Sequence, residues 1–552
     1  MAGIPAAPRR RRGPFIGPRP FDAHDESLFL GRERDIALLL TLWRRNRLTI
    51  LHSDAAAGKT SLLRAGLIPR LHAGNASVMP LGHAAPCRVW PAAALPGHNP
   101  YVLALLSSWD AEETLGRLAA QPIEEFVRRR AGFDRNGEPA PVFAAIDQAE
   151  TFLRRRPADH VHRRRFLREL FDALAHRPDL RLLLSVRTDY LDDLRHEVKL
   201  ANGPEHAEYT LGPFTPETAA FVLVRSAQAT LLRVPRDEVE ELLTELRTIR
   251  DDAGEVERLA HAVDPLLLQI AAARVWGGPP PHRRLGPARL RAEVEHALRD
   301  WCGRVLAETA AEHELAPRHV ESWLRGALLR TAGSAAPATP ITDAFLHTLE
   351  DRQLIADGRH DAGPELPRPR LRAPLRRLDA GQWPAGSPGP AALLRAAVRA
   401  RAEDEPGRAA RLARRAAGDC PPGEMRIRAE IESLLGTLAY EQGLLEEAVT
   451  GYRGAANLYE AMSDGTAVGW ALAAIGRIRL AQGRRSTAIE HLMAAVSRVP
   501  NDPLVQTGLG QALRASGQTG AALDVLVRVL ERDEIPEARR AYDELLGGPD
   551  AS

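Results

Sequence analysis

The feature that most constrains the fold is a short loop, residues 53–60, with the sequence Ser-Asp-Ala-Ala-Ala-Gly-Lys-Thr. An apolar stretch, residues 48–51, precedes it, and a helix-forming stretch, residues 61–67, follows it. A loop between a buried strand and a helix places backbone N–H groups at the helix N-terminus, where they bind phosphate. The spacing therefore predicts a mostly parallel α/β sheet wrapped by helices, with a P-loop at the sheet edge.

The residue types in this loop suit a nucleoside triphosphate. We expect Lys59 to reach the β- and γ-phosphates and the Thr60 hydroxyl to bind Mg²⁺. Lysine is rare here, because Lys59 and Lys199 are the only two among 74 basic residues, which favours a specific role for the Lys59 ammonium. The expected phosphate-binding residues are Ser53, Asp54, Ala55, Ala56, Ala57, Gly58, Lys59, Thr60 and Ser61.

Two further apolar stretches end in charged residues. Residues 142–146 are followed by Asp147 and Glu150, and residues 182–186 are followed by Arg187. The carboxyl ends of parallel strands meet at one edge of a sheet. We expect Asp147 to hold Mg²⁺ through water, Glu150 to orient or deprotonate the attacking water, and Arg187 to sense the γ-phosphate. An ordinary strand-end acid and an ordinary surface arginine are the alternatives.

The loop departs from the usual pattern at two positions. Ser53 stands where a first glycine is usual, and Ala56 stands where many P-loops have another glycine. A positive φ at a non-glycine residue costs roughly 1–2 kcal/mol. These departures leave nucleotide binding expected and make slow hydrolysis, or none, an open alternative.

Bulk composition excludes several classes of protein. Lys plus Arg, 74, nearly balances Asp plus Glu, 72, so no global field favours nucleic acid or an anionic membrane. The three cysteines, Cys87, Cys302 and Cys420, are far apart and form no CxxC pair, which argues against a disulfide framework or a zinc site. No run of 18 apolar residues occurs, and no apolar stretch follows the four N-terminal arginines. A cytoplasmic protein is expected.

At 552 residues the chain requires several domains. The pattern predicts a flexible arm at 1–20, a P-loop domain at 21–215, a helical lid at 216–290, a winged helix at 291–380, a linker at 381–390 and a repeat domain at 391–548. After Phe214 no further strand is expected until the polar turn between residues 354–355 and 370–372, which would suit the wing.

The last region is periodic. Aligning Leu435-Gly436, Ile475-Gly476 and Leu509-Gly510 gives spacings of 40 and 34 residues. The alignment also brings into register three later sets, namely Gly443, Gly483 and Gly517; Ala448, Ala488 and Ala522; and Tyr452, Leu492 and Leu526. Small residues at fixed points of a helix pair resemble tetratricopeptide repeats, which stack into an α-solenoid. Generic amphipathic helices are the alternative.

Together these motifs resemble the STAND NTPases, the signal-transduction ATPases that include NACHT and bacterial NLR-like proteins and are related to AAA+ proteins. The resemblance covers roughly residues 15–375 and rests on the segments 17–21, 25–33, 61–71, 147–150, 185–190, 211–214 and 264–269. It implies that Arg32 lies against the nucleotide base and that Pro265 packs near the adenine. The cofactors implied are ATP or ADP with Mg²⁺.

The resemblance fails in the winged helix. Relatives carry a His-Asp pair there whose histidine contacts the ADP β-phosphate, and this sequence has Arg368 and Pro369 instead. Arg368 is expected to contact a phosphate in place of the histidine. A second acid that follows Glu150 in the family is Thr151 here.

The resemblance implies a switch between a closed, ADP-bound monomer and an open, ATP-bound form that associates with itself. The repeats would sense a protein partner or ligand, and a separately encoded effector would respond, in bacterial immunity or conflict signalling. The family motif begins near residue 17, so no N-terminal effector domain is expected. Two alternatives stay open: a pseudo-NTPase scaffold without turnover, and a DNA-binding regulator, which the near-neutral charge disfavours.

Overall fold

The computed structural model describes residues 13–547 except 55–56, 75, 86–88, 96, 133–139, 155–159, 231, 251–255, 278–284, 330–340, 357–363, 380, 382, 384–387 and 534. The chain divides into two compact units. The P-loop unit comprises Met1–Leu81, Ala131–Leu153 and Pro178–Ser387, and the repeat unit comprises Gly82–Arg130, Arg154–Arg177 and Pro388–Ser552. Residues 1–12 of the expected arm, half of the expected linker, and Cys87 lie outside the described residues.

A five-stranded parallel sheet organises the P-loop unit. Its strands, in the spatial order β2-β3-β4-β1-β5, are β1 (Leu48–Ser53), β2 (Ser77–Val78), β3 (Val142–Ile146), β4 (Leu180–Arg187) and β5 (His206–Thr210). Every residue of β1 and β3 is buried, as expected for parallel strands covered on both faces. The registers pair Ser53 with Arg187 and Ile146 with Leu184, so β1, β3 and β4 end at one edge.

Helix α1 (Glu33–Arg45) packs on this sheet with an apolar stripe of helical period. Its buried residues are Ile36, Leu39 and Trp43, and the Trp43 Nε1–H donates to the Arg181 carbonyl at 3.0 Å. Acidic residues occupy its first turn and Arg44 and Arg45 its last, which complements the helix dipole. The shorter elements are η1 (Ala23–Leu28), α2 (Lys59–Ser61), the π-helical η2 (Leu62–Leu67), α3 (Ile68–Ala73), α7 (Glu150–Leu153), η4 (Thr188–Tyr190) and α9 (Leu191–Leu200).

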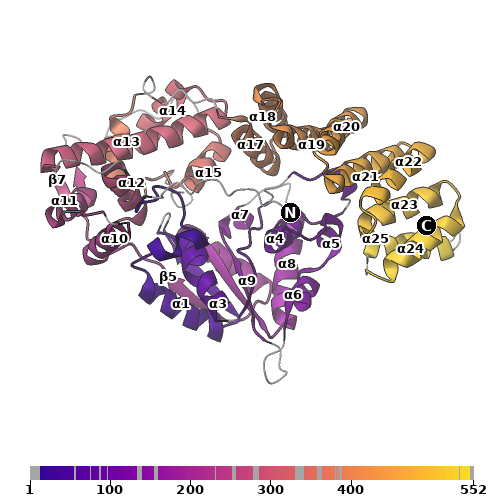
Figure 1. Cartoon of the computed structure of the whole chain (residues 1–552), viewed down its shortest axis with the longest axis horizontal. Coiled ribbons are helices and arrows are strands. Elements are labelled where there is room, and N and C mark those ends of the chain that lie inside the picture. Colours follow the sequence, from indigo (N-terminus) through magenta and orange to yellow (C-terminus); the bar gives the residue numbers. More distant parts are fainter. Residues whose placement is uncertain are drawn as a thin grey trace, which may run out of the picture. The chain divides into compact units, whose positions relative to one another are not determined.

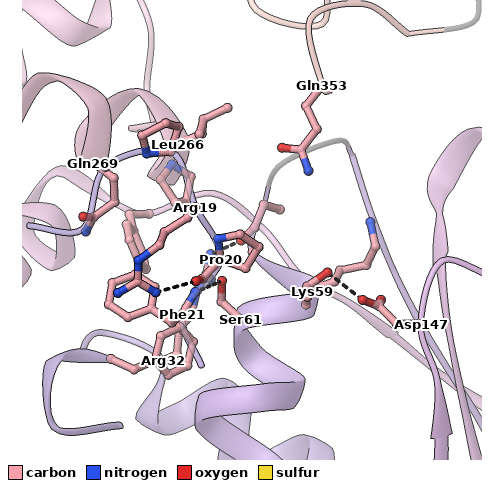
Figure 2. A pocket seen from close by; sticks show the side chains of 18 of the residues that line it. Arg19, Pro20, Phe21, Arg32, Lys59, Ser61, Asp147, Leu266, Gln269 and Gln353 are labelled. Atoms are coloured by element: carbon pink, nitrogen blue, oxygen red, sulfur yellow. Dashed lines mark hydrogen bonds between the residues drawn. The ribbon is translucent and has the colours of Figure 1, made fainter. Parts of the chain in front are cut away.

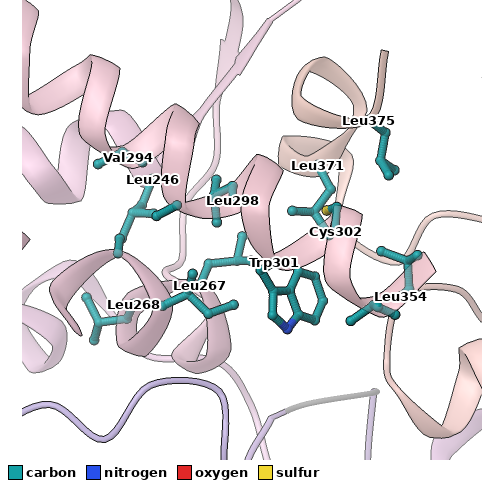
Figure 3. Close-up of a cluster of buried hydrophobic side chains, with 14 of the residues drawn as sticks. Leu246, Leu267, Leu268, Val294, Leu298, Trp301, Cys302, Leu354, Leu371 and Leu375 are labelled. Carbon is teal, nitrogen blue, oxygen red and sulfur yellow. The ribbon is translucent and has the colours of Figure 1, made fainter. Parts of the chain in front are cut away.

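Residues after Phe214 form a helical region with a single apolar core. Its helices are α10 (Pro216–Ala229), α11 (Arg236–Arg247), α12 (Pro265–Trp276), α13 (Pro287–Glu312), α14 (Pro317–Trp323), η5 (Leu324–Leu328), α15 (Asp343–Asp351), η6 (Pro369–Leu371) and α16 (Arg372–Arg376). Figure 3 shows Leu267 of α12, Trp301 of α13 and Leu371 of η6 in one cluster. Side chains of Thr215 and Asp264 cap α10 and α12, and each helix begins with proline.

Strands do not stop entirely at Phe214. A short antiparallel hairpin of β6 (Thr248–Arg250) and β7 (Val256–Leu259) interrupts the helices. An antiparallel bridge between Ala356 and Glu365 lies where the wing is expected. The winged-helix assignment and the domain bounds remain predictions.

Two segments from within the expected P-loop domain belong to the repeat unit. They contain η3 (Ala92–Ala94), α4 (Pro100–Trp109), α5 (Leu115–Ala120), α6 (Ile123–Arg130) and α8 (His160–His176). Thr437, on the array described below, donates its hydroxyl to the Trp90 carbonyl at 3.0 Å. Asp502 accepts the Gly116 N–H at 3.2 Å, although the two residues are 386 positions apart.

The C-terminal region is an α-solenoid of consecutive antiparallel helices, drawn in orange to yellow in Figure 1. They are α17 (Pro390–Ala402), α18 (Pro406–Asp419), α19 (Met425–Glu441), α20 (Leu445–Ala461), α21 (Gly465–Ala481), α22 (Arg485–Arg498), α23 (Pro503–Ala515), α24 (Thr519–Leu530) and α25 (Pro536–Leu546). Each of the three turn glycines that the alignment brings into register has a φ of +74° to +82°, a conformation that glycine adopts without strain.

The other aligned glycines explain the period of the sequence. A Cβ at Gly476 would lie 2.6 Å from Leu492 Cγ, and one at Gly510 would lie 2.8 Å from Leu526. Gly436 meets Tyr452 in the same way, at 2.9 Å. Each aligned glycine therefore faces its aligned large residue on the next helix, which is the close approach that the alignment predicts.

None of the helices in the described part of the chain is both long and apolar enough to cross a membrane. Cys302 and Cys420 are both buried thiols.

Candidate nucleotide site

The carboxyl ends of β1, β3 and β4 open onto a cavity of about 140 Å³. Its walls come from the entry segment (residues 17–32), the P-loop, the strand ends, α12 and the end of α15 (Figure 2). Ligand pockets usually measure about 300–1,000 Å³. A nucleotide could therefore enter this cavity only if side chains that now line it moved.

The described part of the P-loop has the expected geometry. Gly58 has a φ of +100°, and its carbonyl accepts the Leu62 N–H at 2.8 Å as the helix begins. The Lys59 ammonium donates to the Ser53 carbonyl at 3.2 Å and to its Oγ at 2.9 Å. Burial lowers the pKa of Lys59, although Glu150 and Asp147 oppose that shift. Ala55 and Ala56 lie outside the described residues.

The Asp147 carboxylate accepts hydrogen bonds from two hydroxyl groups. Thr60 Oγ1 donates to one carboxylate oxygen at 2.6 Å, and Ser185 Oγ donates to the other at 2.7 Å. Asp147 is only 2% exposed. A hydroxyl and a carboxylate in direct contact beside a phosphate loop are the donor set that Mg²⁺ uses in P-loop proteins.

Glu150 and Arg187 are buried, and each has a polar side-chain atom without a hydrogen bond. Glu150 Oε2 and Arg187 Nη1 have no hydrogen-bond partner among the described residues. Burial raises the pKa of Glu150, and Lys59 offsets this shift in part. Burial by itself lowers the pKa of Arg187, but Asp189, Glu350 and Glu150 together raise it above its ordinary value. Unsatisfied buried charges are costly, so both atoms fit a site that gains polar partners when a ligand binds.

The opposite wall is apolar and aromatic. The Arg32 guanidinium lies 4.3 Å from the Phe214 ring centroid and donates to the Ala57 carbonyl at 2.9 Å. The Phe21 N–H donates to Ser61 Oγ at 3.1 Å, which ties the entry segment to the P-loop helix (Figure 2). Pro265 also lines the cavity. A wall with apolar and aromatic side chains beside a polar end suits a base joined to phosphates.

Helix α15 closes the cavity from the region expected to be a winged helix. Glu350 Oε2 lies 3.6 Å from Arg187 Nη1, and both side chains are almost fully buried. Gln353, which follows this helix, has a φ of +65° and lines the cavity (Figure 2). Gln148, beside Asp147, likewise has a φ of +56°. Non-glycine residues in this conformation often mark functional sites.

A family model described as Novel STAND NTPase 1 matches residues 14–321, more than half of the 552 residues. The chain belongs to this STAND NTPase family. Membership implies nucleotide binding, which agrees with the cavity. None of the curated protein sequences compared with the chain matches it.

Several solved structures are similar to this STAND NTPase. A Walker-type ATPase of Pyrococcus abyssi shares 19% identity over 65% of this chain and 98% of its own, with a TM-score of 0.40. A STAND protein with a tetratricopeptide repeat sensor from Pyrococcus horikoshii shares 13% identity over 98% of this chain and 80% of its own, with a TM-score of 0.28. The ORC2 protein of Aeropyrum pernix, in ADPNP–ADP complexes, shares 11% identity over 62% and 93%, with a TM-score of 0.33.

The STAND NTPase brings most of the expected site residues into one cavity. Those that line it are Arg32, Ala57, Gly58, Lys59, Thr60, Ser61, Asp147, Glu150, Arg187 and Pro265. Ser53 and Asp54 are not among the lining residues, but Ser53 holds Lys59. The roles assigned to all of these residues remain proposals.

Arg368 does not line the cavity, and its expected contact with a phosphate remains a proposal. Its Nε donates to Asp264 Oδ2 at 2.7 Å and its Nη1 donates to the Gln353 carbonyl at 2.6 Å. A buried guanidinium is most stable beside a carboxylate, and Asp264 supplies one. Arg368 thus joins the N-terminus of α12 to Gln353, behind the cavity wall.

Six of the polar or charged lining residues were not expected as site residues, namely Arg19, Gln148, Gln269, Glu350, Asp351 and Gln353. Gln148 and Gln269 stand inside motifs that carry the family resemblance, which is a signal that could have found them. Glu350 and Gln353 lie in no motif, so only their packing reveals them.

Proposed function

We propose that this STAND NTPase is a signalling ATPase that binds ATP or ADP with Mg²⁺ in the cavity and changes state with the nucleotide. The observation that supports this proposal best is the pair of unsatisfied atoms, Glu150 Oε2 and Arg187 Nη1, in the cavity that holds Lys59. A buried carboxylate oxygen without a hydrogen bond, and a buried guanidinium nitrogen whose only contact is the 3.6 Å ion pair with Glu350, cost stability in the free protein. A phosphorylated ligand with its water would satisfy both.

Each residue has a role in this proposal. Thr60 and Asp147 would hold Mg²⁺, which neutralises phosphate charge when bound. Lys59 exchanges its bonds to Ser53 for phosphate oxygens, and Arg187 neutralises charge at the γ-phosphate. Glu150, with the pKa raised by burial, accepts a proton from the attacking water.

Arg32 and Pro265 form the base side of the proposed site, since both line the wall opposite the strand ends. The ion pair of Arg187 with Glu350 links the proposed γ-phosphate sensor to α15. A γ-phosphate would compete with Glu350 for the same guanidinium. We propose that this competition couples the nucleotide to the position of α15.

The finer parts of the proposal concern partners. The solenoid would bind a protein partner or ligand, and a separately encoded effector would respond, in bacterial immunity or conflict signalling. Association of the ATP-bound form with itself is part of the proposal. Light scattering of the purified chain with ATP and with ADP tests this association, and equal masses in the two samples would contradict it.

Replacement of Lys59 tests the nucleotide site. Lys59→Ala should abolish the nucleotide that co-purifies with the chain and the release of phosphate from [γ-³²P]ATP, because no other lysine reaches the cavity. Lys199→Ala is the matched control, since Lys199 is the other lysine of the chain and is exposed on α9. Wild type and Lys59→Ala with the same nucleotide content and the same turnover would sink the ATPase proposal.

A pseudo-NTPase scaffold is the second candidate. The bonds from Lys59 to Ser53 favour it, because the lysine is already satisfied within the loop. In that case wild type and Lys59→Ala would retain the same amount of nucleotide, and neither would release phosphate. The same two measurements therefore distinguish the candidates.

A further inference from the structure

The α15 wall of the nucleotide cavity contains one side chain that can donate a hydrogen bond. Among the described residues, α15 and the turn after it contribute three lining residues, Glu350, Asp351 and Gln353. An ionised carboxylate only accepts hydrogen bonds, whereas the amide of glutamine also carries two N–H donors. Of these three side chains, Gln353 is therefore the one that suits a ligand group made of acceptors.

The Gln353 amide is unbonded and open. It has no hydrogen-bond partner among the described residues, and neither of its atoms belongs to the buried atoms that lack a partner, so solvent reaches it. Figure 2 shows its side chain extending from the segment after α15 toward the P-loop. Gln269, which lines the cavity from α12, differs because its Oε1 already accepts the Ile16 N–H at 3.2 Å.

The backbone of Gln353 is held in place. Its N–H donates to the Glu350 carbonyl at 2.8 Å, and its carbonyl accepts a hydrogen bond from Arg368 Nη1 at 2.6 Å. Arg368 is 4% exposed and also binds Asp264, the residue that caps α12. The side chain thus starts from a backbone that is fixed before a ligand arrives, which reduces the entropy lost on binding.

The position of the amide favours the phosphate end of a nucleotide. The side chain extends toward the P-loop, where Lys59 lines the cavity, whereas Arg32 and Pro265 lie in the wall proposed for the base. Phosphate oxygens accept hydrogen bonds, and a hydrogen bond to an anion is about twice as strong as one between neutral groups. A ribose hydroxyl also accepts hydrogen bonds, so the test below separates these two parts of the ligand.

We propose that the Gln353 amide donates a hydrogen bond to a phosphate oxygen of the bound nucleotide, and that Arg368 positions Gln353 through its carbonyl. This inference rests on the proposed nucleotide site and adds a contact to it. A γ-phosphate competes with Glu350 for Arg187, whereas Gln353, three residues further on, attracts phosphate. The nucleotide therefore acts on this short segment in two opposite ways.

ADP binding by variants of the full-length chain tests the contact. In titration calorimetry, Gln353→Glu should weaken ADP binding about tenfold or more, because a carboxylate of the same shape cannot donate and repels phosphate. Gln353→Met removes the donor without adding charge and should weaken binding about fivefold. Gln228→Glu is the matched control, since it makes the same change on α10 outside the cavity lining and should bind ADP as wild type does.

The compound 2′,3′-dideoxy-ADP separates a phosphate contact from a ribose contact. It keeps the diphosphate but lacks both ribose hydroxyls, so Gln353→Glu should weaken its binding by the same factor as for ADP. A loss that disappears with the dideoxy compound would assign the amide to the ribose and overturn the proposal. Circular dichroism would confirm that each variant is folded, and each variant at residue 353 keeps a side chain at a φ of +65°.

Arg368→Lys tests the positioning role. Lysine keeps a cation beside Asp264 but lacks the planar fork that reaches both Asp264 and the Gln353 carbonyl. It should weaken ADP binding about threefold in the wild-type background and have no further effect in combination with Gln353→Met. Equal losses in the two backgrounds would show that Arg368 acts independently of Gln353, as a direct phosphate contact would, and would overturn this role.

The remaining outcomes separate this proposal from the nucleotide site itself. If wild type binds ADP more tightly than Lys59→Ala does, and Gln353→Glu binds it as wild type does, the Gln353 contact is wrong and the nucleotide site stands. Wild type that binds ADP no better than Lys59→Ala would overturn both.

Discussion

The nucleotide cavity and the repeat unit each bury a carboxylic acid, and the two acids differ in how they are satisfied. Glu150, in the cavity, is 7% exposed and one of its oxygens has no partner among the described residues. Asp502, at the start of α23, is 2% exposed and accepts N–H groups from Gly116, Leu504 and Val505. Burial raises the pKa of both.

From this difference we infer a chemical role for Glu150 and a structural role for Asp502. An unsatisfied buried acid stays available for a proton or a ligand, at a cost in stability. A fully bonded acid caps a helix and holds a neighbouring segment. Substitutions in the cavity should therefore change turnover more than stability, and substitutions in the array should do the reverse.

The largest expected effect is on turnover. Glu150→Gln should lower ATP hydrolysis about 10²–10⁴-fold, because the amide cannot accept the proton of the attacking water, while nucleotide retention persists. Because burial raises the pKa of Glu150, wild-type turnover should decline on acidification at a higher pH than an exposed glutamate would give. The acid must be ionised to act, so the rate rises with pH.

Phosphate release measured across a pH series checks this prediction. Glu197→Gln, on α9 outside the cavity lining, is the control and should behave as wild type. Turnover by Glu150→Gln at the wild-type rate would show that Glu150 is structural, like Asp502.

The second effect is on the stability of the repeat unit. Burial raises the pKa of Asp502 from 3.8 to about 6, so the folded protein holds this proton more tightly than the unfolded chain does. Its contribution to stability is therefore complete below about pH 4 and is lost as the pH rises through about 6, a change of about 3 kcal/mol.

Hydrogen exchange of the Leu504 and Val505 amides between pH 4 and 7 measures this change, after correction for intrinsic exchange rates. Asp502→Asn should make the opening free energy nearly independent of pH in this window, since asparagine still caps the helix but does not titrate. A wild-type curve as flat as that of the variant would contradict the assignment.

Sequence patterns predicted those parts of the site that follow from the order of elements along the chain. Thr60 and Asp147 meet because parallel strands end at one edge, and the 2.6 Å hydrogen bond between them needs no further information. The repeat period likewise predicted a helix pair with small residues at fixed points, and Gly476, one of these, faces Leu492.

Contacts made by tertiary packing were not predictable in the same way. Glu350 reaches Arg187 only because α15 folds against the cavity, and helical periodicity indicates burial but not the partner. Arg368 was assigned by its position relative to a family motif, yet it does not line the cavity and its Nε donates to Asp264. Nothing local in the sequence relates Gly116 to Asp502.

The smallest expected effect is on the stability of the array. It tests whether the close packing at its glycines fixes the distance between neighbouring helices. A Cβ at Gly451 would lie 2.7 Å from Gly436 N and 2.9 Å from the Glu432 carbonyl oxygen, both backbone atoms that cannot move aside. Gly451→Ala should therefore destabilise α19 and α20 by about 1–3 kcal/mol, more than the gain of about 1 kcal/mol in helix propensity.

At Gly454, on the same helix, the Cβ would meet only the end of the Glu432 side chain at 3.2 Å. Gly454→Ala should thus be neutral or stabilising, and both variants should retain nucleotide as wild type does. Hydrogen exchange across residues 425–461 would show the difference, and equal effects of the two substitutions would mean that the array tolerates closer helices than its glycines indicate.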